Sequence, residues 1–110
     1  LAMKAYRDAL EINPYLTDAW IDFSLFLHDN NKTTETLDTL NEAIALNLDS
    51  PELYCIMAGV HFDYGNCSKA SYFLEKALQD NPEMSEVLFE NFPYLYSNNK
   101  VINLVKKYEK

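Results

Sequence analysis

The sequence predicts an all-α fold made of helix-turn-helix pairs, and three observations support this prediction. Similar segments begin at Ala9, Ala43 and Ala77, so one period of 34 residues fits the whole chain. Within each period the apolar residues recur at steps of three and four, as on one face of a helix. Each period also places asparagine or glycine, which enter the left-handed conformation at least cost, where a helix should end. These expected C-cap positions are Asn31, Gly65 and Asn99.

Seven helices are expected, and no strand pattern competes with them. Apolar stripes define their lengths, and two starts are marked by an N-cap residue followed by proline, at Ser50-Pro51 and Asn81-Pro82. The expected ranges are residues 2–12, 15–30, 33–47, 51–64, 67–80, 84–91 and 100–109.

The first expected helix, residues 2–12, matches only the second half of a period, because residues 1–14 have no partner helix before them. Its apolar face, formed by Met3, Tyr6 and Leu10, would then lack its neighbour. Exposed apolar faces of this kind favour association. We therefore expect the chain to self-associate through this helix.

The chain departs from the repeat at Phe92 and Pro93. Proline has no amide to donate and clashes with the carbonyl four residues earlier, so the preceding helix should end near Asn91. We expect residues 92–98 to form an irregular aromatic segment that folds over the last layer of the core. The closing helix is basic in its final turns, which suits its macrodipole and a natural C-terminus at or near the last residue. These basic residues are Lys106, Lys107 and Lys110.

Charge and composition limit the partners of this chain of 110 residues, the length of one domain. Asp and Glu number 17 against 9 Lys and Arg, giving a formal charge of -8. Such a field repels phosphate backbones and anionic lipids, so we expect neither nucleic acid nor membrane as a partner. Two cysteines are too few for the disulfide framework of small secreted domains. A cytoplasmic location is expected, unless a targeting signal precedes Leu1.

The repeat resembles the tetratricopeptide repeat, a hairpin of 34 residues with a large aromatic, a small residue four positions on, a late alanine and a closing proline. These places are held by Tyr54, Ala58, Ala77 and Pro82 in one unit and by Trp20, Ser24, Ala43 and Leu48 in the unit before it. The resemblance implies a right-handed superhelical α-solenoid forming the C-terminal part of a longer repeat protein. The expected single domain comprises a truncated repeat (1–14), two repeats (17–50 and 51–84) and an atypical capping repeat (85–110).

The resemblance also implies a non-catalytic function in binding a protein or peptide in a concave groove, lined mainly by the first helix of each unit. By position this groove includes Asp18, Ile21, Asp22, Leu25, His28, Glu52, Cys55, Ile56, Gly59, Phe62, Asp63, Glu86, Phe89 and Glu90. An apolar floor with acidic sides suits a basic, apolar segment, although the acidic face could be merely solvated. A second alternative is a purely structural cap, with the ligand site in upstream repeats.

No residue pattern indicates catalysis, a metal or a cofactor. Cys55 and His61 are six residues apart on one expected helix and so lie on different faces, and neither Cys67 nor His28 completes a nucleophile-base motif. The ligand spacings of zinc and calcium sites are absent. We expect His61 to be a hydrogen-bonded core residue, Cys55 a small core or groove residue and Cys67 a helix-start residue. Gly59 indicates either close helix packing, which is favoured, or an opening in the groove floor.

Overall fold

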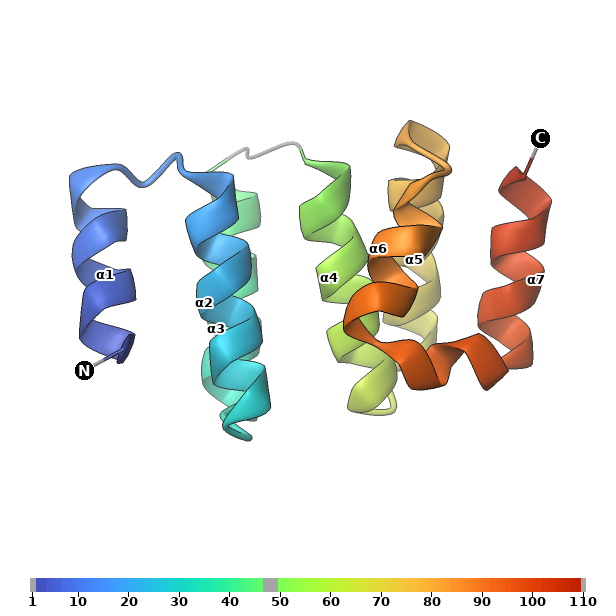
Figure 1. Cartoon of the computed structure of the whole chain (residues 1–110), viewed down its shortest axis with the longest axis horizontal. Coiled ribbons are helices and arrows are strands. Elements are labelled where there is room, and N and C mark those ends of the chain that lie inside the picture. The colour runs from blue at the N-terminus through green and yellow to red at the C-terminus, as the bar shows by residue number, and fades with distance from the viewer. Residues whose placement is uncertain (1, 47–49, 110) are drawn as a thin grey trace. The chain divides into compact units, whose positions relative to one another are not determined.

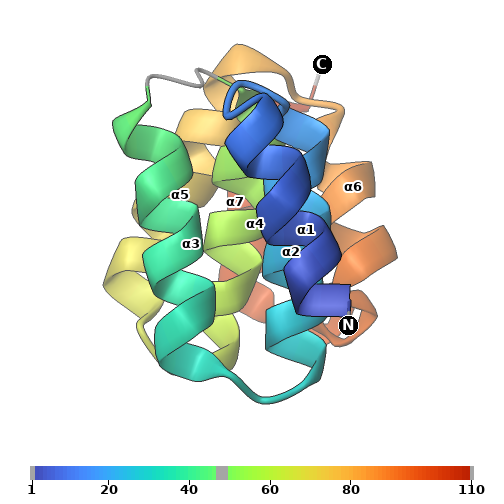
Figure 2. The same ribbon diagram turned by 90° about the vertical axis from the view of Figure 1, so that its left-hand side faces the viewer.

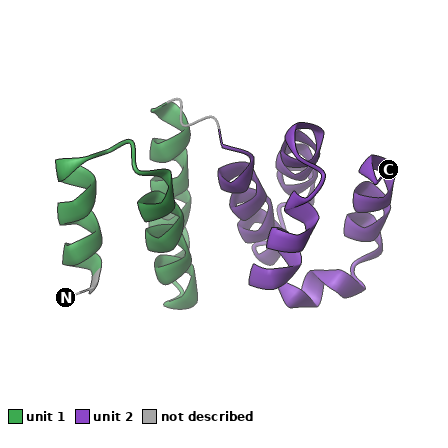
Figure 3. Cartoon of the chain, turned by 45° about the horizontal axis from the view of Figure 1, so that its top comes forward, with its two compact units in different colours: residues 1–49 green, residues 50–110 purple. Residues whose placement is uncertain are grey.

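The computed structural model describes residues 2–46 and 50–109, where all regular secondary structure is helical and no strand occurs (Figure 1). The helices are α1 (Ala2–Ile12), α2 (Thr17–Asp29), α3 (Thr33–Ala45), α4 (Pro51–Asp63), α5 (Cys67–Asp80), α6 (Met84–Asn91), the 3-10 helix η1 (Pro93–Ser97) and α7 (Asn99–Tyr108). The all-α prediction is confirmed, with ends close to those expected. Three residues assigned above, Asn47, Leu48 and Lys110, lie outside the described ranges. The chain divides into two compact units, residues 1–49 and 50–110 (Figure 3).

The first unit holds α1, α2 and α3, and α2 contacts both of its neighbours (Figure 2). Asn31, in the turn between α2 and α3, has a φ of 60°, the left-handed conformation that was predicted. The ring of Tyr6 stacks on that of Phe23 with centroids 5.4 Å apart, and Leu10 is 8% exposed. The prediction that the apolar face of the first helix lacks a neighbour is therefore wrong, because α2 covers it.

The second unit pairs α4 with α5, places α6 against α4, and places α7 against α5. Gly65, in the turn between α4 and α5, has a φ of 79°, again left-handed as predicted. Ser50 caps α4 because its hydroxyl accepts a hydrogen bond from the amide of Leu53, and Pro51 is the first helical residue. Both start signals of α4 are thus confirmed.

The predicted N-cap at Asn81 is wrong. The residue before α6 is Glu83, whose amide donates to Oδ1 of Asn81 over 3.0 Å. Asn81 therefore closes a short turn ahead of the helix, because an asparagine side chain can bond an amide two residues on in place of capping a helix directly.

Small residues are fully buried in both units. Ser24 and Ala43 in the first unit, and Ala58 and Ala77 in the second, are 0% exposed. The Ser24 hydroxyl donates to the carbonyl of Trp20 over 2.7 Å, which satisfies its polarity inside the core. Short side chains allow helix axes to approach closely, and full burial of these four residues is consistent with that expected role.

The segment after α6 is more regular than predicted. The helix ends at Asn91, as Pro93 requires, but the next residues form η1 instead of an irregular stretch. Leu95 is buried there and anchors the segment on the core. Asn99 is the first residue of α7, not a C-cap, and Asn98 caps that helix by accepting amide hydrogen bonds. The extra 3-10 turn leaves no helix to end at Asn99.

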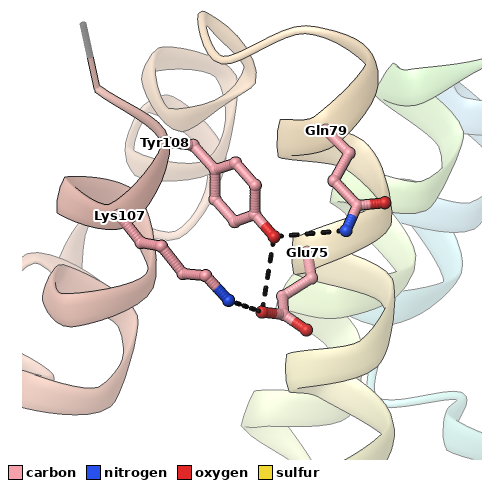
Figure 4. Close-up of polar contacts among 4 residues, drawn as sticks. All are labelled: Glu75, Gln79, Lys107 and Tyr108. Carbon is pink, nitrogen blue, oxygen red and sulfur yellow. Dashed lines mark hydrogen bonds and ion pairs between the residues drawn. The ribbon is translucent and has the colours of Figure 1, made fainter.

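Helix α7 completes the second unit by packing on α5. Val101 and Val105 are buried. At its last turn Lys107 Nζ donates to Glu75 Oε1 over 3.1 Å, and the Tyr108 hydroxyl accepts from the amide of Gln79 (Figure 4). Because exposed ion pairs contribute little to stability, the buried valines hold this helix in place.

Candidate functional site

The predicted groove residues of α2 divide between an accessible and a buried side. Asp18 and Asp22 are exposed, and Leu25 and His28 are partly exposed. Ile21 is only 4% exposed and belongs to the core. Its prediction as a groove residue is therefore wrong, whereas the other four side chains can reach a ligand.

Two predicted groove residues of α4 lie in the core because α6 packs on this part of the second unit. Cys55 and Ile56 are 0% exposed. The Cys55 thiol donates to the backbone carbonyl of Met84 over 3.4 Å. Burial, assisted by the negative charge of Glu52, raises the pKa of the Cys55 thiol to about 12. The thiol is therefore protonated at neutral pH and is neither a groove contact nor a nucleophile.

Gly59 is also buried, and its neighbour is Phe92. A Cβ atom added to Gly59 would overlap the Phe92 ring. The packing interpretation of Gly59 is confirmed, and its assignment to an open groove floor is wrong. An aromatic side chain of the same chain fills the space that a ligand side chain would need.

The other predicted residues of the second unit remain accessible on α4 and α6, which lie against each other. Phe62 and Phe89 are partly exposed, and the Phe89 ring meets the edge of Tyr96 with centroids 4.8 Å apart. The acidic residues of this set are exposed or partly exposed: Glu52, Asp63, Glu86 and Glu90. This part of the predicted groove thus combines partly covered aromatic rings with carboxylates.

A cavity of about 760 Å³, not predicted from the sequence, lies within the first unit. It is lined by residues of α1, α2 and α3 together with the turns that follow α1 and α3, and none of the predicted groove residues is among them. One signal could have indicated it: Glu35, Asp38 and Glu42 recur at steps of three and four and so share one face of α3. Trp20, predicted as a packing residue, forms part of its floor.

His61 is a core residue with a hydrogen-bond partner, as predicted. It is 5% exposed, its ring stacks on Phe73, and the side-chain amide of Asn66 lies 3.2 Å from Nδ1. Burial, with a smaller effect of Lys69, lowers the pKa of His61 below its usual 6.5. Cys67 is the first residue of α5, also as predicted, and its side chain is exposed. Across residues 2–46 and 50–109, no three His, Cys, Asp or Glu side chains gather as metal ligands.

Comparison with known proteins identifies no relative: no protein family, no curated protein and no solved structure matches this chain. In the described part of the chain, no helix has the length and apolar composition needed to cross a membrane.

Proposed function

We propose that this chain is a tetratricopeptide-like interaction module that binds a peptide or protein segment without catalysing a reaction. The observation that supports the proposal is a turn shared by two helix pairs: α2–α3 and α4–α5 are each joined by three residues, and the middle residue, Asn31 or Gly65, has a positive φ. Helices joined so closely run antiparallel. Pairs of this kind stack into a right-handed solenoid, in which the surface shape and not a reactive group performs the function.

The accessible residues on the first helix of each pair support a basic and apolar ligand. On α2 the exposed Asp22 accompanies the partly exposed Leu25, and on α6 the exposed Glu86 and Glu90 accompany Phe89. Carboxylates beside apolar side chains attract lysine or arginine while the apolar groups exclude water. The formal charge of -8 adds long-range steering of a cationic partner.

One observation favours a second function, the purely structural cap. Phe92 fills the space beside Gly59, and η1 and α7 cover the second unit. A unit whose groove is filled by its own side chains is suited to closing an array of repeats. On this alternative the ligand would bind to upstream repeats and to neither unit described here.

Variants of accessible groove residues distinguish the two functions. A partner captured with the chain should bind Leu25→Asp and Phe62→Asp at least about tenfold more weakly, because each change buries an unpaired carboxylate against apolar groups. Tyr94→Asp is the matched control, since Tyr94 is 53% exposed and lies outside the predicted groove. A structural cap would show equal binding in all three variants. Affinity that does not fall with added salt would contradict the basic ligand.

A further inference from the structure

The cavity of the first unit has the dimensions of a binding site. Its volume of about 760 Å³ lies within the roughly 300–1,000 Å³ typical of ligand pockets. Its lining residues come from α1, α2 and α3 and from the turns after α1 and α3. Figure 2 shows these helices, with α3 to the left and α1 to the right. Every lining residue belongs to the first unit, so the cavity needs no contribution from residues 50–110.

The floor of the cavity is apolar. Leu10, Trp20 and Phe23 line it, together with Pro14 from the turn after α1. The Trp20 indole donates its N–H to the carbonyl of Pro14 over 2.6 Å. Because the indole N–H already has a hydrogen-bond acceptor, a bound segment can make apolar contacts with the floor without leaving a buried donor unpaired.

Exposed apolar side chains also lie close in sequence to Pro14, which lines the cavity from the turn after α1. Three of the six most exposed large apolar side chains of the described residues lie in this turn and at its edges: Ile12 (86%), Tyr15 (65%) and Leu16 (45%). Apolar side chains that gather beside a cavity indicate an interaction surface more strongly than isolated ones. Their extent suits a segment of several residues better than a small molecule.

The rim of the cavity is acidic. Glu11, Glu35, Asp38 and Glu42 line it, against the single cation of Arg7. Within the described residues none of these four carboxylates has an ion pair or hydrogen bond. Three of them lie three or four residues apart on α3, where like charges repel. A cationic partner would relieve this repulsion, and an anionic one would increase it.

We infer that this cavity is a docking site for a basic, apolar segment of another protein. Leucine-like side chains of the segment occupy the floor around Trp20, and its lysine or arginine side chains meet the carboxylates of α3. The inference goes beyond the proposed function, because none of the residues assigned to the first-helix groove lines this cavity.

The test uses the full chain and a synthetic amphipathic peptide of leucine and lysine, about four helical turns long. Trp20 is the only tryptophan, so its fluorescence reports on the cavity alone. Trp20 is only 6% exposed in the free chain, so saturable binding with a change in the intensity of its emission is expected. Two matched peptides, one with glutamate for lysine and one with serine for leucine, should bind at least about tenfold more weakly, since each removes one half of the complementarity.

Three double variants with the same change in charge locate the site. Asp38→Lys with Glu42→Lys should weaken binding of the leucine-lysine peptide at least about tenfold. The control, Asp80→Lys with Glu109→Lys, changes exposed carboxylates of the second unit and should stay within about twofold of the original chain. Glu86→Lys with Glu90→Lys tests the first-helix groove separately.

Several results would overturn the inference. If the α3 variant and the control lost affinity for the peptide equally, general charge attraction would explain the binding. A loss confined to the α6 variant would support the proposed function while excluding this cavity. Binding without a change in Trp20 emission would place the peptide elsewhere. Sedimentation of the chain without peptide tests one more possibility. If the chain self-associates and the α3 variant does not, a second copy of the chain occupies the cavity in place of a segment of another protein.

Discussion

The ring of Phe92 lies against the α-carbon of Gly59, in the space that a Cβ atom would occupy on any other residue. Phe92 is 2% exposed although it stands one residue before the 3-10 helix η1. The contact therefore joins the C-terminal segment to the middle of α4. It also explains why a residue unfavourable to helices stands at this position.

The Gly59 contact predicts that Gly59→Ala destabilises the chain although alanine is the better helix former. Alanine gains about 1 kcal/mol in helix propensity, but overpacking against Phe92 should cost about 1–3 kcal/mol. We expect a net loss in the free energy of unfolding, measured by urea denaturation followed by circular dichroism.

A double-mutant cycle separates these two effects. In a Phe92→Ala background the overlap is gone, so Gly59→Ala should become stabilising by about 1 kcal/mol. Gly59→Ala that stabilises the chain with Phe92 present would contradict the packing described here.

Gly65 should be sensitive for a different reason. Its φ is 79°, and nothing lies within 4 Å of an added Cβ. Gly65→Ala should therefore cost about 1–2 kcal/mol of stability through the backbone alone, and no second substitution should rescue it. Gly65→Asn is the matched control, since asparagine tolerates this conformation and occupies it at Asn31 with a φ of 60°. Equal stability of the alanine and asparagine variants, measured by urea denaturation, would contradict this account.

Much of the helical fold was predictable because apolar spacing and turn residues determine local structure. Apolar residues at steps of three and four predicted the helices. Asn31 and Gly65 predicted the turns, because few other residues enter the left-handed region. The prediction of a helix C-cap at Asn99 was wrong because α6 ends early, before Pro93, and the chain continues through η1. A spacing taken from intact repeats cannot anticipate an added 3-10 turn.

The candidate site was less predictable. Residue charge and position on the predicted helices correctly indicated carboxylates that are exposed, such as Asp22 and Glu90. Burial of Cys55 depends on α6, and filling of the Gly59 space depends on Phe92, both more than 25 residues away in the chain. The cavity beside Trp20 combines three helices, and no local pattern specifies how closely three helices approach.

The two cysteines should differ sharply in reactivity. Cys67 is exposed, whereas the Cys55 thiol is buried with a pKa raised to about 12. In a Cys67→Ser variant at pH 8, alkylation of Cys55 should proceed about a thousandfold or more slowly than alkylation of Cys67 in a Cys55→Ala variant, because it requires unfolding. Mass spectrometry measures both rates. In urea the two rates should become equal, and a fast reaction of native Cys55 would contradict its burial.

The raised pKa of Cys55 also predicts loss of stability in alkali. The unfolded thiol ionises near pH 9, whereas the folded thiol stays neutral to about pH 12. The contribution of the neutral Cys55 thiol to the free energy of unfolding is therefore complete below pH 9 and decreases as the pH rises toward 12. Relative to a Cys55→Ala variant, the free energy of unfolding of the original chain should fall across this interval, measured by urea denaturation at fixed pH. A constant difference would show that the thiol is not desolvated.

His61 should make stability depend on pH in the opposite direction. Burial, then Lys69, lowers the pKa of folded His61 below the usual 6.5, so the unfolded chain takes up a proton that the folded chain refuses. The stabilisation is present above pH 6.5 and decreases as the pH falls toward the folded pKa, with a slope of at most about 1.4 kcal/mol per pH unit. Urea denaturation between pH 7.5 and about pH 5 checks this, with His28→Gln expected to keep the dependence and His61→Phe to lose it. Nuclear magnetic resonance titration of the His61 ring gives the direct test: a midpoint at or above 6.5 in the folded chain would contradict the burial of this histidine between Phe73 and Asn66.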